Sequence, residues 1–184
     1  MAIPVLWLIG PSGVGKSSVG WAVYTRLYRT GDLTGYVDLD QVGLCYPQPQ
    51  DDPNNHRVKA AGLAAMLQVY RGFGATRLVV CGGAEHADLA PLYLERLPDT
   101  DSVIVRLRAD SATLRERIFA RGRGHGPALP GGFVGLPDET LEEMAREAAD
   151  EADALDRCDF AHACIDTDGR TVAELADEVL TLFP

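Results

Sequence analysis

The chain has 184 residues, of which 46% are hydrophobic and 24% are charged, a length and composition that suit one globular domain over residues 1–184. Its formal net charge of -10 argues against a surface for nucleic acids or anionic membranes, because both partners are polyanions. No run of about 18 apolar residues is present, and the first residues lack the pattern of a secretory leader, so we expect a cytoplasmic protein without a membrane span.

The N-terminal half alternates apolar runs typical of strands with amphipathic stretches typical of helices. In the first helix, Val19, Val23 and Leu27 share one face and should point to the core. Asp38 and Asp40 end the second strand, where strand alternation would aim both carboxylates to the same side. The expected elements are strands at 3–9, 35–40 and 77–83, a proline-containing loop from 41 to about 53, and helices at about 16–28, 54–70 and 86–97.

The C-terminal half continues this alternation, with strands expected at 102–108 and 161–167. Asp110 can cap a helix at 111–122, and the pair Thr171 and Glu174 forms a capping box that opens a last helix. Residues 122–137 hold too much glycine and proline for a helix interior or a strand, so we expect a mobile loop or lid there. The core-facing residues expected in the last two helices are Leu141, Met144, Ala145, Ala148, Ala152 and Leu155, then Val172, Leu175, Ala176, Val179 and Leu180.

This order of elements predicts a three-layer α/β domain, in which helices cover both faces of a parallel sheet. The four cysteines have no CxxC spacing. Because Cys81 and Cys164 lie in apolar strand-like runs, we expect buried thiols rather than disulfides or zinc ligands.

A phosphate-binding loop is indicated between the first strand and the first helix. The stretch from Gly10 to Ser17 fits G-x-x-x-x-G-K-[ST] at every specified position. Its backbone N–H groups would wrap the phosphates, Lys16 would reach the β- and γ-phosphates, and Ser17 would bind Mg²⁺. A glycine turn that merely connects a strand to a helix does not require the Lys-Ser pair. The expected nucleotide contacts are Gly10, Ser12, Gly13, Val14, Gly15, Lys16, Ser17 and Ser18.

The loop alone does not separate kinases from GTPases, motors or transport ATPases. A guanine-specific GTPase should carry an N/T-K-x-D motif after a later strand, and the chain has none. Residues 166–169 match D-x-x-G, but they lie at the last strand–helix junction rather than beside the third strand. A switch GTPase is therefore disfavoured.

Several features in order resemble the small-molecule P-loop kinases, in particular the shikimate, gluconate and adenylylsulfate kinases and the chloramphenicol phosphotransferase. These features are Lys16, the pair Asp38 and Asp40, "VVCGG" at the end of the third strand, "LRERIFARGRG" before the glycine-rich segment, and "IDTDGRT" after the fifth strand. The resemblance implies a five-stranded parallel sheet in the order 2-3-1-4-5. It places ATP at the carboxyl edge of the first strand, and the acceptor between the second strand and the lid, where open α/β sheets bind ligands.

The resemblance also implies roles for charged residues. Asp38 would support Mg²⁺, and Asp40 would orient the acceptor hydroxyl and accept its proton. Arg117 and Arg121 share a helical face, so that Arg117 would pack on the adenine and Arg121 would reach the phosphates from the lid. Turn-forming aspartates and an ordinary basic helix end are the alternatives. Asp168 and Arg170 lie in the loop expected to pass the adenine edge.

On the acceptor side, Gly82 and Gly83 would let an acceptor approach the backbone closely. Glu85 is a candidate lining residue, and a charge at a helix N-terminus is the alternative explanation for it. Arg57 would suit an anionic acceptor, although a surface arginine beside a helix cap explains it nearly as well.

The leading hypothesis is an ATP- and Mg²⁺-dependent phosphotransferase that acts on a hydroxyl of a small molecule. A second hypothesis is a nucleotide-binding regulatory or accessory protein that phosphorylates no acceptor. A polynucleotide 5′-hydroxyl kinase is a third, and the charge of -10 disfavours it. The sequence does not name the acceptor.

Overall fold

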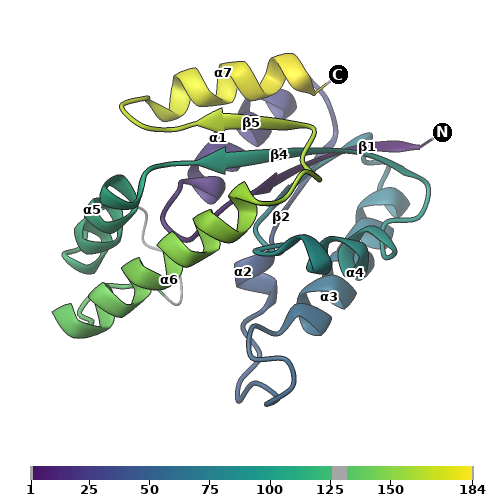
Figure 1. Ribbon diagram of the computed structural model, residues 1–184. Coiled ribbons are helices and arrows are strands. Elements are labelled where there is room, and N and C mark those ends of the chain that lie inside the picture. Colours follow the sequence, from purple (N-terminus) through teal and green to yellow (C-terminus); the bar gives the residue numbers. More distant parts are fainter. Residues whose placement is uncertain (1, 126–131, 184) are drawn as a thin grey trace.

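The computed structural model describes residues 2–125 and 132–183, which form a parallel five-stranded sheet with helices on both faces (Figure 1). The strand order is β2-β3-β1-β4-β5, which confirms the predicted topology. The central strand β1 pairs with β3 from Val5 to Leu8 and with β4 from Ile3 to Ile9. The strands are β1 (Ile3–Ile9), β2 (Thr34–Asp38), β3 (Arg77–Cys81), β4 (Thr100–Arg108) and β5 (Ala163–Asp166).

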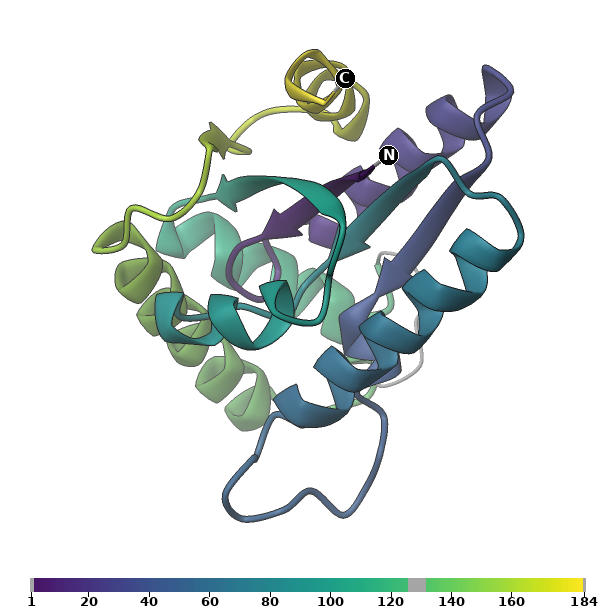
Figure 2. The ribbon, with the colours of Figure 1, turned by 90° about the vertical axis from the view of Figure 1, so that its right-hand side faces the viewer.

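Alternation along β1 divides the core into two layers. Leu6 and Leu8 belong to one buried cluster, whereas Val5, Trp7 and Ile9 belong to another on the opposite face, as the period of two in a strand requires. The first cluster takes its helical partners from α1 (Lys16–Arg29), α5 (Ser111–Gly122), α6 (Asp138–Asp156) and α7 (Val172–Leu182). The second packs mainly against α3 (His56–Gly72) and α4 (Ala90–Leu94), which follows the 3₁₀ turn η1 (Ala87–Leu89). Figure 2 shows the sheet between these helical layers.

Two predicted helix starts are confirmed by their caps. The Asp110 carboxylate accepts a hydrogen bond from the Thr113 amide at 2.6 Å. Thr171 and Glu174 form the reciprocal capping box that opens α7. Val172, which was expected to face the core, is exposed instead, because the first residue of α7 lies on its solvent side; Leu175, Ala176 and Val179 are buried.

The second strand is shorter than predicted. It ends at Asp38, whose carboxylate accepts a hydrogen bond from the Asp40 amide at 3.1 Å and thereby caps the short helix α2 (Leu39–Val42). Asp40 therefore lies on a helix, and strand alternation is the wrong reason for placing it beside Asp38. Short polar side chains at caps favour this turn over continued extension.

The cysteine prediction is confirmed in part. All four cysteines are free thiols, and Cys81 is buried. Cys164 is exposed, contrary to expectation, because β5 is an edge strand that buries Ile165 on its covered face and turns Cys164 the other way.

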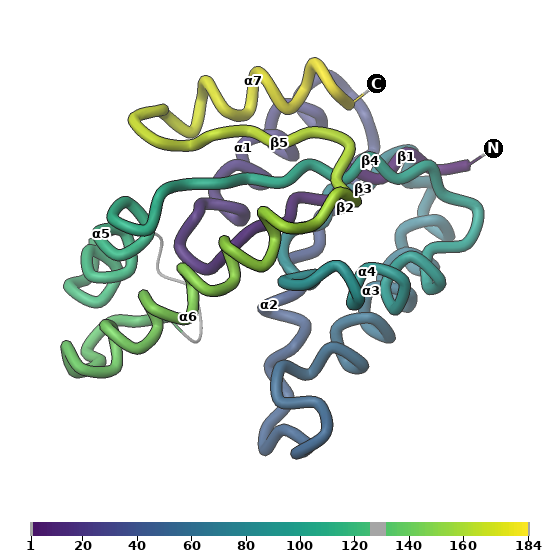
Figure 3. The backbone as a smooth tube through the Cα atoms, in the orientation of Figure 1, coloured from purple at the N-terminus to yellow at the C-terminus, as the bar shows by residue number. Residues whose placement is uncertain are grey.

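The lid predicted at 122–137 includes residues 126–131, which lie outside the described residues, so the lid stays a prediction. Gly122 still belongs to α5, and Pro137 directly precedes α6. The tube in Figure 3 shows α5 and α6 running side by side on the same flank of the sheet. None of the helices within 2–125 and 132–183 is both long and apolar enough to cross a bilayer.

The close packing of Gly20 in α1 against Cys81 in β3 gives a stability prediction. A Cβ added at Gly20 of α1 would lie 2.2 Å from the Cys81 sulfur of β3, whereas one added at Gly72 of α3 would meet no atom within 4 Å. Gly20→Ala should lower the free energy of unfolding by about 1–3 kcal/mol through overpacking. Gly72→Ala should instead raise it by up to about 1 kcal/mol, because the helix loses a flexible residue. Urea unfolding of the two variants measures the difference, and equal effects would contradict the contact.

Candidate nucleotide and acceptor site

The phosphate-binding loop turns sharply where β1 meets β4, and glycine is required there. Gly10 has φ of 144°, and a Cβ on it would lie 2.4 Å from the Leu107 carbonyl oxygen. Gly13 has φ of 81° and lies against Ile118, while Gly15 has φ of 107° with no atom near its missing Cβ. Glycine adopts these values without strain. The first two glycines therefore permit close packing, and the third leaves the inner side of the loop open.

Lys16 begins α1 and folds back over the loop. Its ammonium group donates to the carbonyl oxygens of Gly10 at 2.8 Å and Pro11 at 3.0 Å. Ser17 and Ser18 follow in the first turn of α1, where the free N–H groups and the helix dipole favour an anion. Val14 contributes its backbone to the turn by donating to the Pro11 carbonyl at 3.3 Å, while its side chain is buried in the core.

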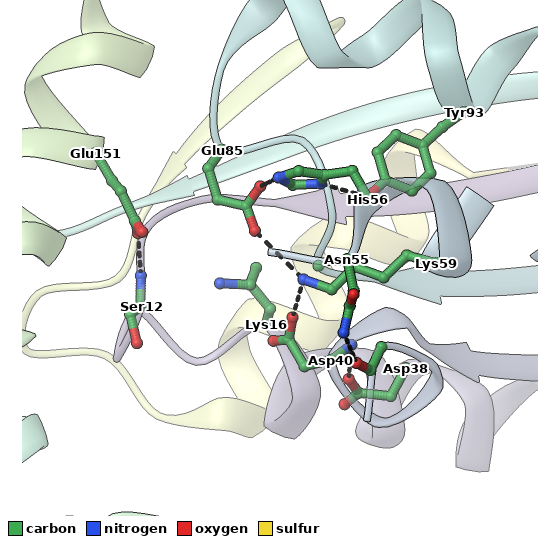
Figure 4. Close-up of polar contacts among 12 residues, drawn as sticks. Ser12, Lys16, Asp38, Asp40, Asn55, His56, Lys59, Glu85, Tyr93 and Glu151 are labelled. Atoms are coloured by element: carbon green, nitrogen blue, oxygen red, sulfur yellow. Dashed lines mark hydrogen bonds and ion pairs between the residues drawn. The ribbon is translucent and has the colours of Figure 1, made fainter. Parts of the chain in front are cut away.

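A carboxylate already lies on the loop. The Ser12 amide donates to Oε2 of Glu151, a residue of α6, at 2.9 Å (Figure 4). Burial raises the pKa of Glu151, while this hydrogen bond and the charge of Lys16 lower it. The Ser12 amide thus donates to a carboxyl oxygen from another element, in the position where the nest of a phosphate-binding loop donates to a phosphate oxygen.

A cavity of about 320 Å³ extends from this loop to the ends of β2 and β3. Of the residues predicted from the sequence, it brings together five loop residues, both aspartates, the glutamate after β3 and Arg121 of α5, whereas Gly10, Val14 and Ser18 are not in its lining. Its lining comprises Ser12, Gly13, Gly15, Lys16, Ser17, Asp38, Asp40, Gln41, Gly43, Leu44, Tyr46, Gln48, Asn54, Lys59, Glu85, Arg121, Gly132, Phe133 and Glu151.

Gly82 and Gly83 lie behind the aspartate rather than in the lining. A Cβ on Gly82 would be 3.2 Å from Oδ1 of Asp40, and one on Gly83 would be 2.7 Å from Leu39 and 3.1 Å from the ring of Tyr93. Both residues have positive φ. Packing of the protein against itself accounts for both glycines, and contact with an acceptor stays a prediction.

Among the residues that the structure describes, Arg57 is not part of the cavity lining. Its guanidinium pairs with Asp51 at 2.8 Å and with Asp52 at 3.4 Å, and more than half of its side chain is exposed. Asp52 also accepts from the amides of His56 at 2.8 Å and Arg57 at 3.0 Å, which caps α3. Arg57 thus belongs to the structure that starts this helix.

Arg117 and Arg121 both lie near the phosphate loop. Arg117 donates to the Val14 carbonyl at 3.2 Å and to the hydroxyl and carbonyl of Thr167 at 2.8 and 2.9 Å, so it ties the loop to the segment after β5. Arg121 lines the cavity with its guanidinium 5.7 Å from the Phe133 ring centre. Burial, and then the charge of Arg117, lower the pKa of Arg121.

Asp168 and Arg170 each contact a neighbouring element. Asp168 accepts from the Asp110 amide at 2.9 Å, and Arg170 pairs with Glu178 at 2.6 Å. Their contact with a nucleotide stays a prediction.

Sequence reasoning named Asp40 and Glu85 but missed the side chains that connect to them, those of Lys59, His56 and Tyr93. Nζ of Lys59 lies 3.3 Å from Oδ1 of Asp40 and 3.8 Å from Oε1 of Glu85. The other oxygen of Glu85 is 3.5 Å from Nε2 of His56, whose Nδ1 is 2.8 Å from the Tyr93 hydroxyl. Figure 4 shows this chain of contacts running from Asp40 to Tyr93. Burial raises the pKa of Glu85 and lowers that of His56, so burial favours the neutral form of each.

A signal for these residues was present in the sequence. His56 and Lys59 fall on the stripe of α3 that buries Ala60, Leu63 and Leu67. In the same way, Glu151 lies between Ala148 and Leu155 on the buried stripe of α6. A charged residue on the apolar stripe of a helix must find a partner in the interior, and each of these has one.

A Mg²⁺ ion fits the donors at one end of the cavity. Ser17 and Asp38 line it together and supply hard oxygen ligands. Across 2–125 and 132–183, no group of three or more His, Cys, Asp or Glu side chains is placed to hold a metal by itself. This suits an ion that takes most of its ligands from phosphate oxygens and water.

No protein-family model matches the chain, and neither does any curated protein. Solved structures do match it. A shikimate kinase from Bacteroides thetaiotaomicron has a TM-score of 0.62 at 17% identity, over 98% of this chain and 98% of that one. A gluconokinase from Sinorhizobium meliloti has 0.60 at 19%, over 97% and 90%. The APS kinase from Mycobacterium tuberculosis in complex with AMPPNP and APS has 0.57 at 18%, over 98% and 97%. The chain has the fold of the small-molecule P-loop kinases.

The contact of Glu151 with the loop predicts competition with phosphate. Glu151→Ala should tighten the binding of ATP by about tenfold or more, because a charge-assisted hydrogen bond no longer has to be broken. Glu147→Ala, which removes an exposed carboxylate from the same helix, should leave the affinity unchanged. Isothermal titration calorimetry with ATP tests both. Weaker binding by Glu151→Ala would mean that the carboxylate supports the ligand instead of competing with it.

Proposed function

We propose that the chain is an ATP- and Mg²⁺-dependent kinase that transfers the γ-phosphoryl group to a hydroxyl of a small molecule. One observation carries the proposal: the amide of Ser12 holds a carboxylate oxygen beside Lys16, at one end of a cavity whose other end carries Asp38 and Asp40. An anion-binding nest and a pair of carboxylates thus share one space of about 320 Å³. The fold shared with small-molecule kinases supports the same reading.

The proposed mechanism begins with exchange of partners at the loop. Triphosphate oxygens replace the Glu151 carboxylate on the Ser12 amide, and Lys16 turns from the Gly10 and Pro11 carbonyls to the β- and γ-phosphates. Ser17 and Asp38 hold Mg²⁺, which supplies neutralisation of phosphate charge when bound. In this proposal Arg117 packs on the adenine, and the backbone of the segment around Asp168 and Arg170 passes the edge of the base.

Transfer then depends on position and charge. Asp40 orients the acceptor hydroxyl toward the γ-phosphorus and accepts its proton late in the reaction. Arg121, which lines the same cavity, stabilises the negative charge on the transferred group. Phosphoryl transfer needs little more than this from a protein, because most of the rate enhancement comes from orientation and electrostatic stabilisation.

Loss of Lys16 tests the nucleotide site. Lys16→Ala should lose about 1.5–3 kcal/mol of ATP binding, the usual contribution of a charge-assisted contact, and should abolish transfer. Arg29→Ala, which removes an exposed cation from the other end of α1, serves as the matched control. Calorimetry measures affinity, and circular dichroism checks that both variants fold. Equal ATP affinities in the two variants would count against the site.

The two aspartates give a matched pair of variants. Asp40→Asn should keep ATP affinity and slow transfer by roughly 10² or more, the scale expected for a lost general base. Asp38→Asn should chiefly raise the Mg²⁺ concentration needed. ADP release that depends on a hydroxylated acceptor is followed at several Mg²⁺ concentrations. Full turnover by Asp40→Asn would transfer the role of base to Asp38. Tight ATP binding with no acceptor-dependent ADP from any hydroxylated compound would instead favour a regulatory nucleotide-binding protein.

A further inference from the structure

The acceptor end of the cavity carries an excess of negative charge. We define this end as the lining contributed by the end of β2, α2, the loop before α3, α3 itself and the segment after β3. Its charged residues are three carboxylates, those of Asp38, Asp40 and Glu85, and one ammonium group, that of Lys59. Even with Glu85 protonated, the two aspartates outnumber the cation before Mg²⁺ binds Asp38. Bound MgATP, itself an anion, adds negative charge next to this end.

The one cation at this end already has partners. The side chain of Lys59 is only 9% exposed, and its ammonium group lies 3.3 Å from Asp40 and 3.8 Å from Glu85. An acceptor carboxylate or phosphate that bound Lys59 would compete with Asp40, which is half exposed, and with Glu85, which would be left largely buried without its counter-ion. Such uncompensated burial of a charge is costly.

Other cations of the described chain do not supply an anion site here. Arg57 is outside the lining and pairs with Asp51 and Asp52. Burial lowers the pKa of His56, whose ring contacts Tyr93 and Glu85. Lys16 and Arg121 line the same cavity and serve the triphosphate in the proposed function, although Arg121 also interacts with the charges of Asp38 and Asp40.

The remaining lining of this end is polar without charge or apolar. Gln48 and Asn54 present amide groups, Tyr46 presents a hydroxyl and an aromatic face, and Leu44 adds an apolar contact. Amides and phenols both donate and accept hydrogen bonds, as the hydroxyl groups of an uncharged molecule require.

We propose that the acceptor is an uncharged or cationic hydroxylated molecule, such as a polyol or an amino alcohol, and that Lys59 serves as the internal counter-ion of Asp40 and Glu85. Lys59 is thereby a positioning residue: it holds the two carboxylates toward the cavity and contacts no anion of the acceptor. That the bound molecule is a phosphate acceptor rests on the proposed function. The charge preference of the acceptor end rests only on its lining residues.

The charge preference is measured without knowing the acceptor. Three nitroxides of similar size, 4-amino-TEMPO, 4-hydroxy-TEMPO and 4-carboxy-TEMPO, are cationic, neutral and anionic probes. Their paramagnetic broadening of the Leu44, Gln48 and Asn54 amide signals reports how each one accumulates at the acceptor end. For each signal, the broadening by the cationic probe is divided by the broadening by the anionic probe. The same ratio at the amide of exposed Phe73 corrects for the overall charge of -10. We expect the cation-to-anion ratio at the acceptor end to exceed that at Phe73 by about threefold or more.

Two variants sharpen this measurement. Glu85→Gln should lower the ratio at the acceptor end, while Glu95→Gln, which removes an exposed carboxylate beside α4, should not. An acceptor-end ratio equal to or below the Phe73 ratio overturns the proposal. Equal effects of the two variants also overturn it, because the preference would then belong to the whole surface.

The role of Lys59 has its own spectroscopic readout. The ¹³C signal of the Glu85 carboxyl reports its titration, which in the wild type reflects burial first and then the opposing charge of Lys59. Lys59→Met should raise the titration midpoint, and Lys59→Arg should restore it, while a purely structural lysine would leave the midpoint in place. An unchanged midpoint in Lys59→Met overturns the positioning role.

Turnover tests the acceptor class directly. Glucose, glucosamine and glucuronate share a ring and differ in charge, and shikimate and gluconate extend the anionic set. Acceptor-dependent ADP release with a neutral or cationic compound supports the proposal, and faster release with an anionic one overturns it. If no compound reacts, the nitroxide ratios decide. Failure of the wild type to bind ATP would reject the proposed function and leave the charge preference to be judged by the nitroxides.

Discussion

The close approach of Gly10 to the carbonyl of Leu107 is the constraint on which the site depends. At the end of β1 the chain must turn back within the space left by β4, and a side chain at this position would collide with the backbone of that strand. With glycine there, the loop closes over the sheet edge and α1 begins immediately afterwards. The free amides, the helix N-terminus and the open face of Gly15 all follow from that one turn.

The second organising principle is that interior charges are joined across elements that lie far apart in the sequence. Asp40 comes from α2, Lys59 from α3 and Glu85 from the segment after β3, and their contacts fix these three elements around the cavity. Glu151 does the same for α6 and the phosphate loop. Asp40 gives the buried ammonium group of Lys59 a counter-ion, and the Ser12 amide gives the carboxyl group of Glu151 a hydrogen-bond donor.

Local sequence signals predicted the elements well. The strand alternation of β1, the cap at Asp110 and the capping box at Thr171 depend on neighbours within a few residues, and the structure has each of them. The helical position of Asp40 was not predicted, because the Asp38 carboxylate caps α2 and ends the strand two residues early. The exposure of Cys164 was not predicted, because burial on an edge strand depends on which of its faces is covered. The residues of β5 do not specify that face.

The site was predictable only where the motif is continuous. The loop from Gly10 to Ser17 is read from eight consecutive residues. The pairing of Lys59 with Asp40 and Glu85 is a property of the fold, because it requires α3 to lie across the ends of β2 and β3. The stripe of apolar residues on α3 shows that Lys59 is buried, but the identity of its partners comes from three dimensions.

Because Gly20 packs against Cys81, labelling of the Cys81 thiol reports how often α1 separates from the sheet. The Cys81 thiol lies beneath α1, and burial raises its pKa, so it is held as an unreactive thiol. Cys45 and Cys164 lie at the surface, where a thiol reagent reaches them while the fold is intact. Alkylation of Cys81 requires α1 to separate from the sheet. The rate of Cys81 labelling therefore measures how often this separation occurs.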